Sequence, residues 1–138
     1  MSRTHPRLVI VDDDESVCRA LKRLGRSCGM EVVTFTSGQD FIDVLAAVPS
    51  FPTDCVVLDL QMPGLNGLEV QDRLTRRGLR FPVVFITAHD EDGARERALA
   101  GGAVAYLRKP FNDELFIKTV GEAFRRVAAT GEERGPRP

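Results

Sequence analysis

Leu8-Val9-Ile10-Val11-Asp12-Asp13-Asp14 decides the fold, because an aliphatic run passes directly into three carboxylates. A short apolar run of this kind is typical of a strand buried on both faces of a parallel sheet. Similar runs precede other reactive side chains further along the chain: Cys55-Val56-Val57-Leu58 before Asp59, Val83-Val84-Phe85-Ile86 before Thr87, and Val104-Ala105-Tyr106-Leu107 shortly before Lys109. Because parallel strands end at one shared edge, where ligands bind, we expect these side chains to converge on one pocket.

Segments with helical periodicity separate these strands and a further strand at Glu31–Phe35. We expect helices over about 16–28 and about 38–48, a third helix that carries Leu68, Val70 and Leu74, and a fourth over 91–100. A last helix should run from about 112 to 128, with Leu115, Phe116 and Val120 on its inner stripe. Gly29, Pro49 and the Gly101-Gly102 pair are typical helix ends. Five strands alternate with five helices, and the crossovers between the strands have the length that right-handed units need. This pattern predicts an α/β fold with a single doubly wound five-stranded parallel sheet.

The bulk properties fit one cytoplasmic domain. The 138 residues are 43% apolar and 28% charged, with a net charge of −1, so no strong field draws the chain to nucleic acid or membrane. No apolar run approaches the roughly 20 residues of a membrane span, and the N-terminus lacks a secretory signal. We expect tails at 1–7 and 129–138 around a domain at 8–128. Cys18, Cys28 and Cys55 lack metal spacing, and we expect Cys18 and Cys55 to be buried.

The acidic residues at the predicted edge indicate a magnesium site. Three consecutive carboxylates repel one another unless water or a cation screens them, although Asp14 is also a plausible cap for the next helix. With Asp59 beside them they form an oxygen-rich site suited to Mg²⁺, which binds through one or two carboxylates plus phosphate oxygens. A carboxylate near such an ion is a competent nucleophile toward phosphorus, and Lys109 and Thr87 supply a charge and a hydroxyl for phosphoryl oxygens.

Four segments carry a family resemblance: VIVDDDESV (9–17), VVLDLQMPGLNGLE (56–69), VVFITAHD (83–90) and GGAVAYLRKPF (101–111). They are similar, in order, to the receiver domain of two-component response regulators, a flavodoxin-like class that includes the chemotaxis receiver. The resemblance covers about residues 8–128 and implies the strand order 2-1-3-4-5. It also implies a phosphoprotein that takes part in signal transduction or a phosphorelay.

Roles for individual residues follow from this resemblance. It implies that Asp59 accepts a phosphoryl group from a sensor histidine kinase or phosphotransfer protein. Mg²⁺ (or Mn²⁺) would be held by Asp12 through a water, by Asp13 and Asp59, and by the backbone carbonyl of Gln61. The phosphoryl oxygens would contact Thr87, the Ala88 N–H and Lys109, and the Lys109–Pro110 peptide is expected to be cis.

The same resemblance implies a switch built on Thr87 and Tyr106. The Thr87 hydroxyl would move toward the phosphoryl group, and the Tyr106 ring would turn from an exposed to a buried position behind it. This would change the face made by the fourth helix, fifth strand and fifth helix, through which a partner, an output domain or a second copy would be contacted. We do not expect the chain to turn over an external substrate, so we do not expect an enzyme in the ordinary sense.

Other functions stay open at this point. Phosphatases with an aspartyl nucleophile usually place a second Asp two residues later, where this chain has Gln61. A flavin carrier needs a hydroxyl- and glycine-rich loop after the first strand, where three carboxylates would repel the cofactor's phosphate. Direct nucleic-acid binding would use arginine clusters near the third helix and the C-terminus, but such clusters are usually solvated faces. His89, beside the predicted pocket, is expected to lie in a solvent-facing loop.

Overall fold

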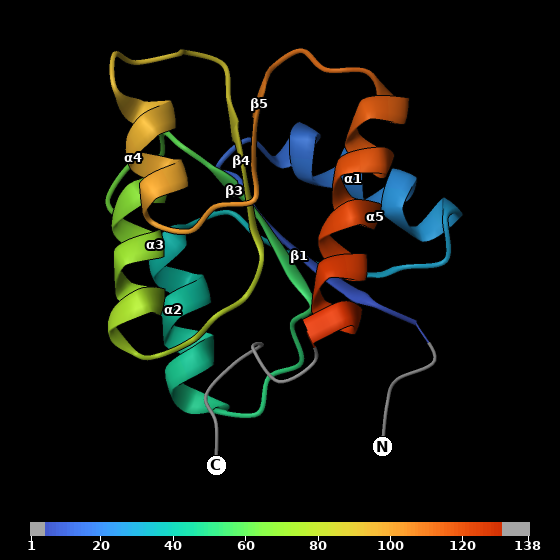
Figure 1. Ribbon diagram of the computed structural model, residues 1–138, viewed down its shortest axis with the longest axis horizontal. Helices are drawn as coiled ribbons and strands as arrows, with labels where there is room; N and C mark the ends of the chain where they lie inside the picture. The colour runs from blue at the N-terminus through green and yellow to red at the C-terminus, as the bar shows by residue number, and fades with distance from the viewer. Residues whose placement is uncertain (1–4, 131–138) are drawn as a thin grey trace.

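Five parallel strands form the centre of the computed structural model, which describes residues 5–130, with side chains through residue 126. The strands are β1 (Arg7–Val11), β2 (Glu31–Phe35), β3 (Cys55–Asp59), β4 (Val83–Thr87) and β5 (Ala105–Arg108). They pair in the order β2-β1-β3-β4-β5, so the predicted α/β class and strand order are confirmed. The loops that leave β4 and β5 rise at the same edge of the sheet (top of Figure 1).

Helices cover both faces of this sheet (Figure 1). They are α1 (Glu15–Ser27), α2 (Gly38–Ala47), α3 (Gly67–Arg76), α4 (Ala94–Ala100) and α5 (Asp113–Thr130). Helices α1 and α5 lie on one face, and α2, α3 and α4 lie on the other. The result is a three-layer arrangement in which the carboxyl edge of the sheet stays accessible.

Alternation along the strands divides the core between the two faces. Leu8 and Ile10 of β1 pack in a cluster with Phe116 of α5, whereas Val9 and Val11 pack in the cluster that contains Phe41 of α2. Successive side chains of a strand point to opposite faces, so a strand covered on both sides must be apolar throughout. Strands β1 and β3 meet this condition, with every residue from 8 to 11 and from 55 to 58 fully buried.

Two details of the helices differ from the prediction. Helix α4 begins at Ala94 rather than 91, because the residue before it, Gly93, has a left-handed φ of 78° that cannot continue into a helix. Leu115, which the apolar pattern of α5 placed toward the core, is 43% exposed. Phe116 and Val120 are fully buried instead, so the inner stripe of α5 starts one residue later.

The predicted burial of Cys18 and Cys55 is confirmed, and Cys28 is exposed. Burial raises the pKa of the Cys55 thiol. Of the predicted tails, residues 1–4 and 131–138 lie outside the described residues, while Arg7 belongs to β1 and α5 runs to Thr130. Within residues 5–130, no helix has both the length and the apolar character needed to cross a membrane.

Candidate functional site

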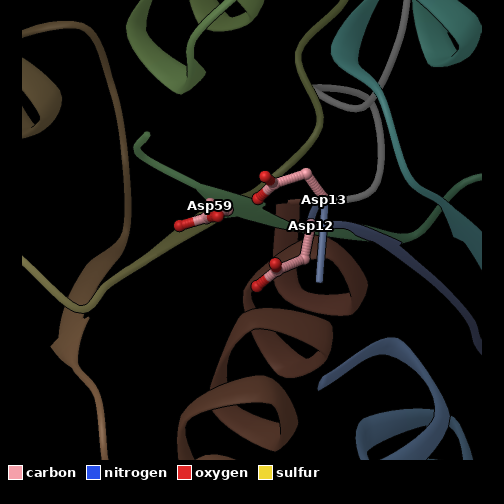
Figure 2. Close-up of side chains that lie close together, drawn as sticks. All are labelled: Asp12, Asp13 and Asp59. Atoms are coloured by element: carbon pink, nitrogen blue, oxygen red, sulfur yellow. The ribbon is translucent and has the colours of Figure 1, made fainter. Parts of the chain in front are cut away.

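Three carboxylates gather at the carboxyl edge of the two central strands. Asp12 and Asp13 follow β1, and Asp59 is the last residue of the neighbouring strand β3. One carboxylate oxygen from each lies within 4.8 Å of the others, and Figure 2 shows the three side chains grouped together. Because Asp12 and Asp59 are buried and Asp13 is exposed, the cluster opens to solvent on one side.

Asp12 is held by contacts to both of its carboxylate oxygens. The Asp14 N–H donates to Oδ1 at 2.9 Å, and Lys109 Nζ donates to Oδ2 at 2.8 Å. Lys109 follows β5, and its ammonium also lies 3.6 Å from Asp59 Oδ1. The fully buried Asp12 carboxylate therefore has a cation and an N–H as partners, as a charge in a protein interior requires.

The electrostatics of this cluster favour an added cation. Burial, reinforced by the negative charge of Asp12, raises the pKa of Asp59 to about 7, although Lys109 opposes the change. Burial alone would lower the pKa of Lys109, but the hydrogen bond to Asp12 and the charge of Asp59 raise it overall. One ammonium thus faces three carboxylates, too few positive charges to balance them, and the carboxylates repel one another. Carboxylate oxygens that converge in this way suit Mg²⁺ or Mn²⁺.

Asp14 has a different task from its two neighbours. Its side chain accepts hydrogen bonds from the backbone N–H groups of Ser16 and Val17, and it is the N-cap of α1. The bonds from the Ser16 hydroxyl and N–H hold the pKa of Asp14 below its ordinary value. The acidic triplet is therefore divided, because its first two members join the cluster while the third begins the helix.

The loop after Asp59 is held close to the sheet edge. A Cβ on Gly67 would lie 2.5 Å from the Asp59 carbonyl oxygen, so only glycine allows α3 to begin so near β3. Asn66 and Glu69 form a capping box at this helix start. Gln61, whose backbone carbonyl is a predicted metal ligand, donates a side-chain hydrogen bond from Nε2 to Glu91. This bond joins the loop after β3 to the loop after β4.

Thr87 is the last residue of β4, as the sequence predicted, and it is buried. Its hydroxyl is bonded to the loop that follows. Its hydroxyl donates to the His89 carbonyl at 2.7 Å and accepts from the His89 N–H at 3.1 Å. Ala88 and His89 are exposed, as expected for a solvent-facing loop. The Thr87 hydroxyl would have to leave the His89 carbonyl in order to donate to a phosphoryl oxygen.

Tyr106 of β5 is 8% exposed, and its hydroxyl donates to Asp90 Oδ1 at 2.8 Å. Burial and this bond raise the pKa of Tyr106 to about 12. The ring is thus buried while the Thr87 hydroxyl bonds His89, whereas the resemblance implied a buried ring only after that hydroxyl moves. The Lys109–Pro110 peptide bond beyond β5 is cis.

Sequence reasoning missed Asp90 and Glu91. Each is the partner of a residue that had been identified, Tyr106 in one case and Gln61 in the other. The partners are separated by 16 and 30 positions, and no motif or spacing signals either pair. Only the neighbouring positions of β3, β4 and β5 in the sheet bring these loops together.

Comparison with known proteins identifies the class that this fold and site define. The family described as the response regulator receiver domain matches residues 8–121, and the chain belongs to that family. It is therefore a receiver domain of the kind found in two-component signalling, as the sequence motifs implied.

The chain is similar to several characterised or structurally solved relatives. It is 41% identical to nodulation protein W of Bradyrhizobium diazoefficiens over 91% of this chain and 51% of that protein. It is 35% identical to transcriptional regulatory protein FixJ of Azorhizobium caulinodans over 93% of this chain and 59% of that protein. A response regulator receiver protein from Burkholderia phymatum has 61% identity and a TM-score of 0.78, covering 87% of this chain and 95% of that one. The chain spans about half to three-fifths of these two curated relatives.

Proposed function

We propose that this domain is a phosphorylation-dependent switch in which Asp59 accepts a phosphoryl group from a sensor histidine kinase or phosphotransfer protein. The observation that carries the proposal is the convergence of Asp12, Asp13, Asp59 and Lys109, which come from three different strand ends. A nucleophilic carboxylate beside a fixed ammonium and further metal-type ligands is the arrangement that phosphoryl transfer to an acid requires.

The transfer itself is a substitution at phosphorus. A carboxylate oxygen of Asp59 forms a P–O bond as the P–N bond of the donor phosphohistidine breaks, and the departing electron pair stays on the imidazole nitrogen, which then takes a proton. Asp59 must be ionised to attack, and its neighbours act on that condition in opposite ways. Burial and Asp12 favour the protonated acid, whereas Lys109 favours the carboxylate.

Mg²⁺ or Mn²⁺ is the proposed cofactor, held by Asp12, Asp13, Asp59 and the backbone carbonyl of Gln61. The donor set fits, because among the described residues three carboxylates share this edge with one ammonium, that of Lys109. When bound, the ion supplies positive charge that offsets the repulsion between the carboxylates and an incoming phosphoryl group. Lys109 then binds one phosphoryl oxygen as a point charge, and Thr87 and the Ala88 N–H bind others as hydrogen-bond donors.

Phosphorylation places about two negative charges at Asp59, which gives the Thr87 hydroxyl a stronger acceptor than the His89 carbonyl. We propose that the resulting movement changes the face made by α4, β5 and α5, and that this face controls a partner, an output domain or a second copy of the chain. The exposed side chains of Leu99 on α4 and Leu115 on α5 offer apolar contacts there. Asp59 is then a phosphoacceptor that assists its own phosphorylation and dephosphorylation, with no turnover of an external substrate.

Labelling with acetyl phosphate and Mg²⁺ tests the assignment of Asp59. Intact-mass measurement should show one added phosphoryl group on the wild-type chain and none on Asp59→Asn. Asp54→Asn is the matched control, because Asp54 precedes the same strand at the opposite edge of the sheet. Labelling of Asp59→Asn to the same extent as the wild type would refute the site, whereas the control should be labelled normally.

A further inference from the structure

The loop between β4 and α4 is tied to β5 by one side chain. Asp90 lies in this loop, and its Oδ1 accepts the 2.8 Å hydrogen bond from the Tyr106 hydroxyl. The Asp90 residue is exposed, whereas Tyr106 is buried. An exposed loop carboxylate is thus the acceptor that holds the polar end of a buried ring, and a bond to a charged acceptor is stronger than one between neutral groups.

Two arginines surround this pair without replacing it. Arg108 Nε lies 3.9 Å from Asp90 Oδ2, and the Arg95 guanidinium carbon lies 5.9 Å from the centre of the Tyr106 ring. The Arg108 side chain is 71% exposed, so its ion pair with Asp90 is well screened by solvent. The hydrogen bond between Asp90 and Tyr106 is therefore the main link from the loop to β5.

The same loop is tied to Thr87 at its other end. The Thr87 hydroxyl bonds both backbone groups of His89, which directly precedes Asp90 in the chain. A displacement of the Thr87 hydroxyl toward Asp59 would break its hydrogen bond to the His89 carbonyl. The backbone of His89 would then be free to move, and Asp90 would move with it as the next residue in the chain. Thr87, the loop and Tyr106 thus form one continuous line of hydrogen bonds and backbone.

We infer that Asp90 is a positioning residue for Tyr106: its carboxylate holds the ring in the buried position and transmits the movement of the loop to β5. This inference rests on the proposed function for its regulatory meaning, because the loop movement starts with phosphorylation of Asp59. The positioning itself concerns only Asp90 and Tyr106. It can therefore be tested without any phosphoryl donor.

The composition of the chain provides a direct probe, since Tyr106 is the only tyrosine and there is no tryptophan. Fluorescence quenching by acrylamide measures how accessible this ring is. Asp90→Ala should raise the quenching constant several-fold, because the ring loses its anchor. Asp90→Asn keeps an oxygen acceptor and should leave the ring almost as protected as in the wild type. Asp92→Ala is the matched control, an exposed carboxylate two residues further along the loop that should change nothing.

Ionisation of the phenol is a second probe of the bond between Asp90 and Tyr106. In wild type, the pKa of Tyr106 is raised to about 12, first by burial and then by the Asp90 bond. In Asp90→Ala the ring should lose both its burial and the Asp90 bond, so phenol absorbance should show ionisation close to the ordinary value of about 10. Asp90→Asn should fall in between, because the carboxylate charge is gone while the ring stays buried. If Asp90→Ala does not fold, the intermediate value expected for Asp90→Asn decides the question.

Wild-type quenching and an unshifted phenol titration in both Asp90 variants would overturn the inference. The coupling is tested separately with acetyl phosphate and Mg²⁺, by recording Tyr106 fluorescence and intact mass on the same samples. Asp90→Ala should gain the phosphoryl group but lose the fluorescence response that the wild type shows. A full response in that variant would contradict transmission through Asp90, whereas absence of labelling in wild type would refute the proposed function and leave the quenching result standing.

Discussion

The carboxyl edge of the sheet has two halves that are built on different principles. Around β1 and β3, the acids Asp12, Asp13 and Asp59 crowd against one ammonium, that of Lys109. Around β4 and β5, by contrast, Thr87 and Tyr106 each have a well-placed hydrogen-bond partner in the loop 88–91. The first half holds unbalanced negative charge, whereas in the second half the hydroxyls of Thr87 and Tyr106 already have hydrogen-bond partners.

In the proposed function, the first half carries out the reaction and the second half gives the response. A region with excess negative charge gains from a bound cation, so we expect the metal affinity of the first half to come from repulsion that the fold imposes. A region whose polar groups are already paired changes only when a stronger partner competes for one of them. The bond between Gln61 and Glu91 joins the two halves. We expect charge to control the first half, and variants that change this charge test the comparison.

The largest effect is expected when Lys109 is replaced by methionine. This change keeps most of the side-chain volume and leaves the fully buried Asp12 carboxylate without its cation. Removing one partner of a buried ion pair leaves the charge of the other partner uncompensated. We therefore expect a loss of about 3 kcal/mol in the free energy of unfolding. Urea denaturation at pH 7 in a metal chelator measures it.

Two further variants sharpen this test. Asp12→Asn combined with Lys109→Met should recover much of the loss, because the orphaned charge is removed as well. Lys118→Met is the matched control, an exposed lysine on α5 that should cost little. Equal losses for Lys109→Met and Lys118→Met would show that the charge balance of the first half has no role in stability.

A smaller effect of opposite sign is expected for Asp59→Asn without divalent metal. The folded-state pKa of Asp59 is about 7, above its unfolded value of about 3.9. Between these pH values the folded chain holds a proton that the unfolded chain has released, so stability falls as the pH rises through this window. Removing the carboxylate should therefore stabilise the fold by about 1–2 kcal/mol above pH 7, less than the whole shift because the asparagine amide is itself a polar group buried at this position.

The dependence on pH is the decisive part of this measurement. The gain from Asp59→Asn should be full above the folded-state pKa and should vanish below about pH 4, where both states bind the proton. Unfolding curves at several pH values, with wild type and variant side by side, would show it. A gain that stays constant with pH, or a loss at neutral pH, would mean that the cluster carries no repulsion at Asp59.

The smallest effect is expected for Asp13→Asn. Asp13 is exposed, and its replacement leaves the carboxylates of Asp12 and Asp59 in place. Mg²⁺ affinity measured by calorimetric titration should fall about tenfold, which corresponds to about 1.4 kcal/mol. Asp14→Asn is the control, since Asp14 caps α1 and an asparagine retains that role. Unchanged affinity in Asp13→Asn would remove this residue from the ligand set.

Much of this site could be anticipated because it depends on strand ends. The apolar runs before Asp12, Asp59 and Thr87 identify strands by local chemistry alone, and parallel pairing then brings their ends together. Asp14 could be recognised only as a possible cap, because its sequence context is equally compatible with a ligand. The start of α4 was misplaced because the acidic side chains of Glu91 and Asp92 suit a first helical turn, whereas Gly93 adopts a left-handed conformation.

The sequence by itself determined the class of fold, the strand order through its family motifs, and the residue types that meet at one edge. These depend on periodicity and on short segments, both of which are local properties of the chain. Only the tertiary structure decided that Lys109 pairs with Asp12 and that Tyr106 is held by Asp90. Contacts of this kind join loops from different crossovers, so their geometry depends on how the strands are twisted and stacked rather than on any residue's neighbours in sequence.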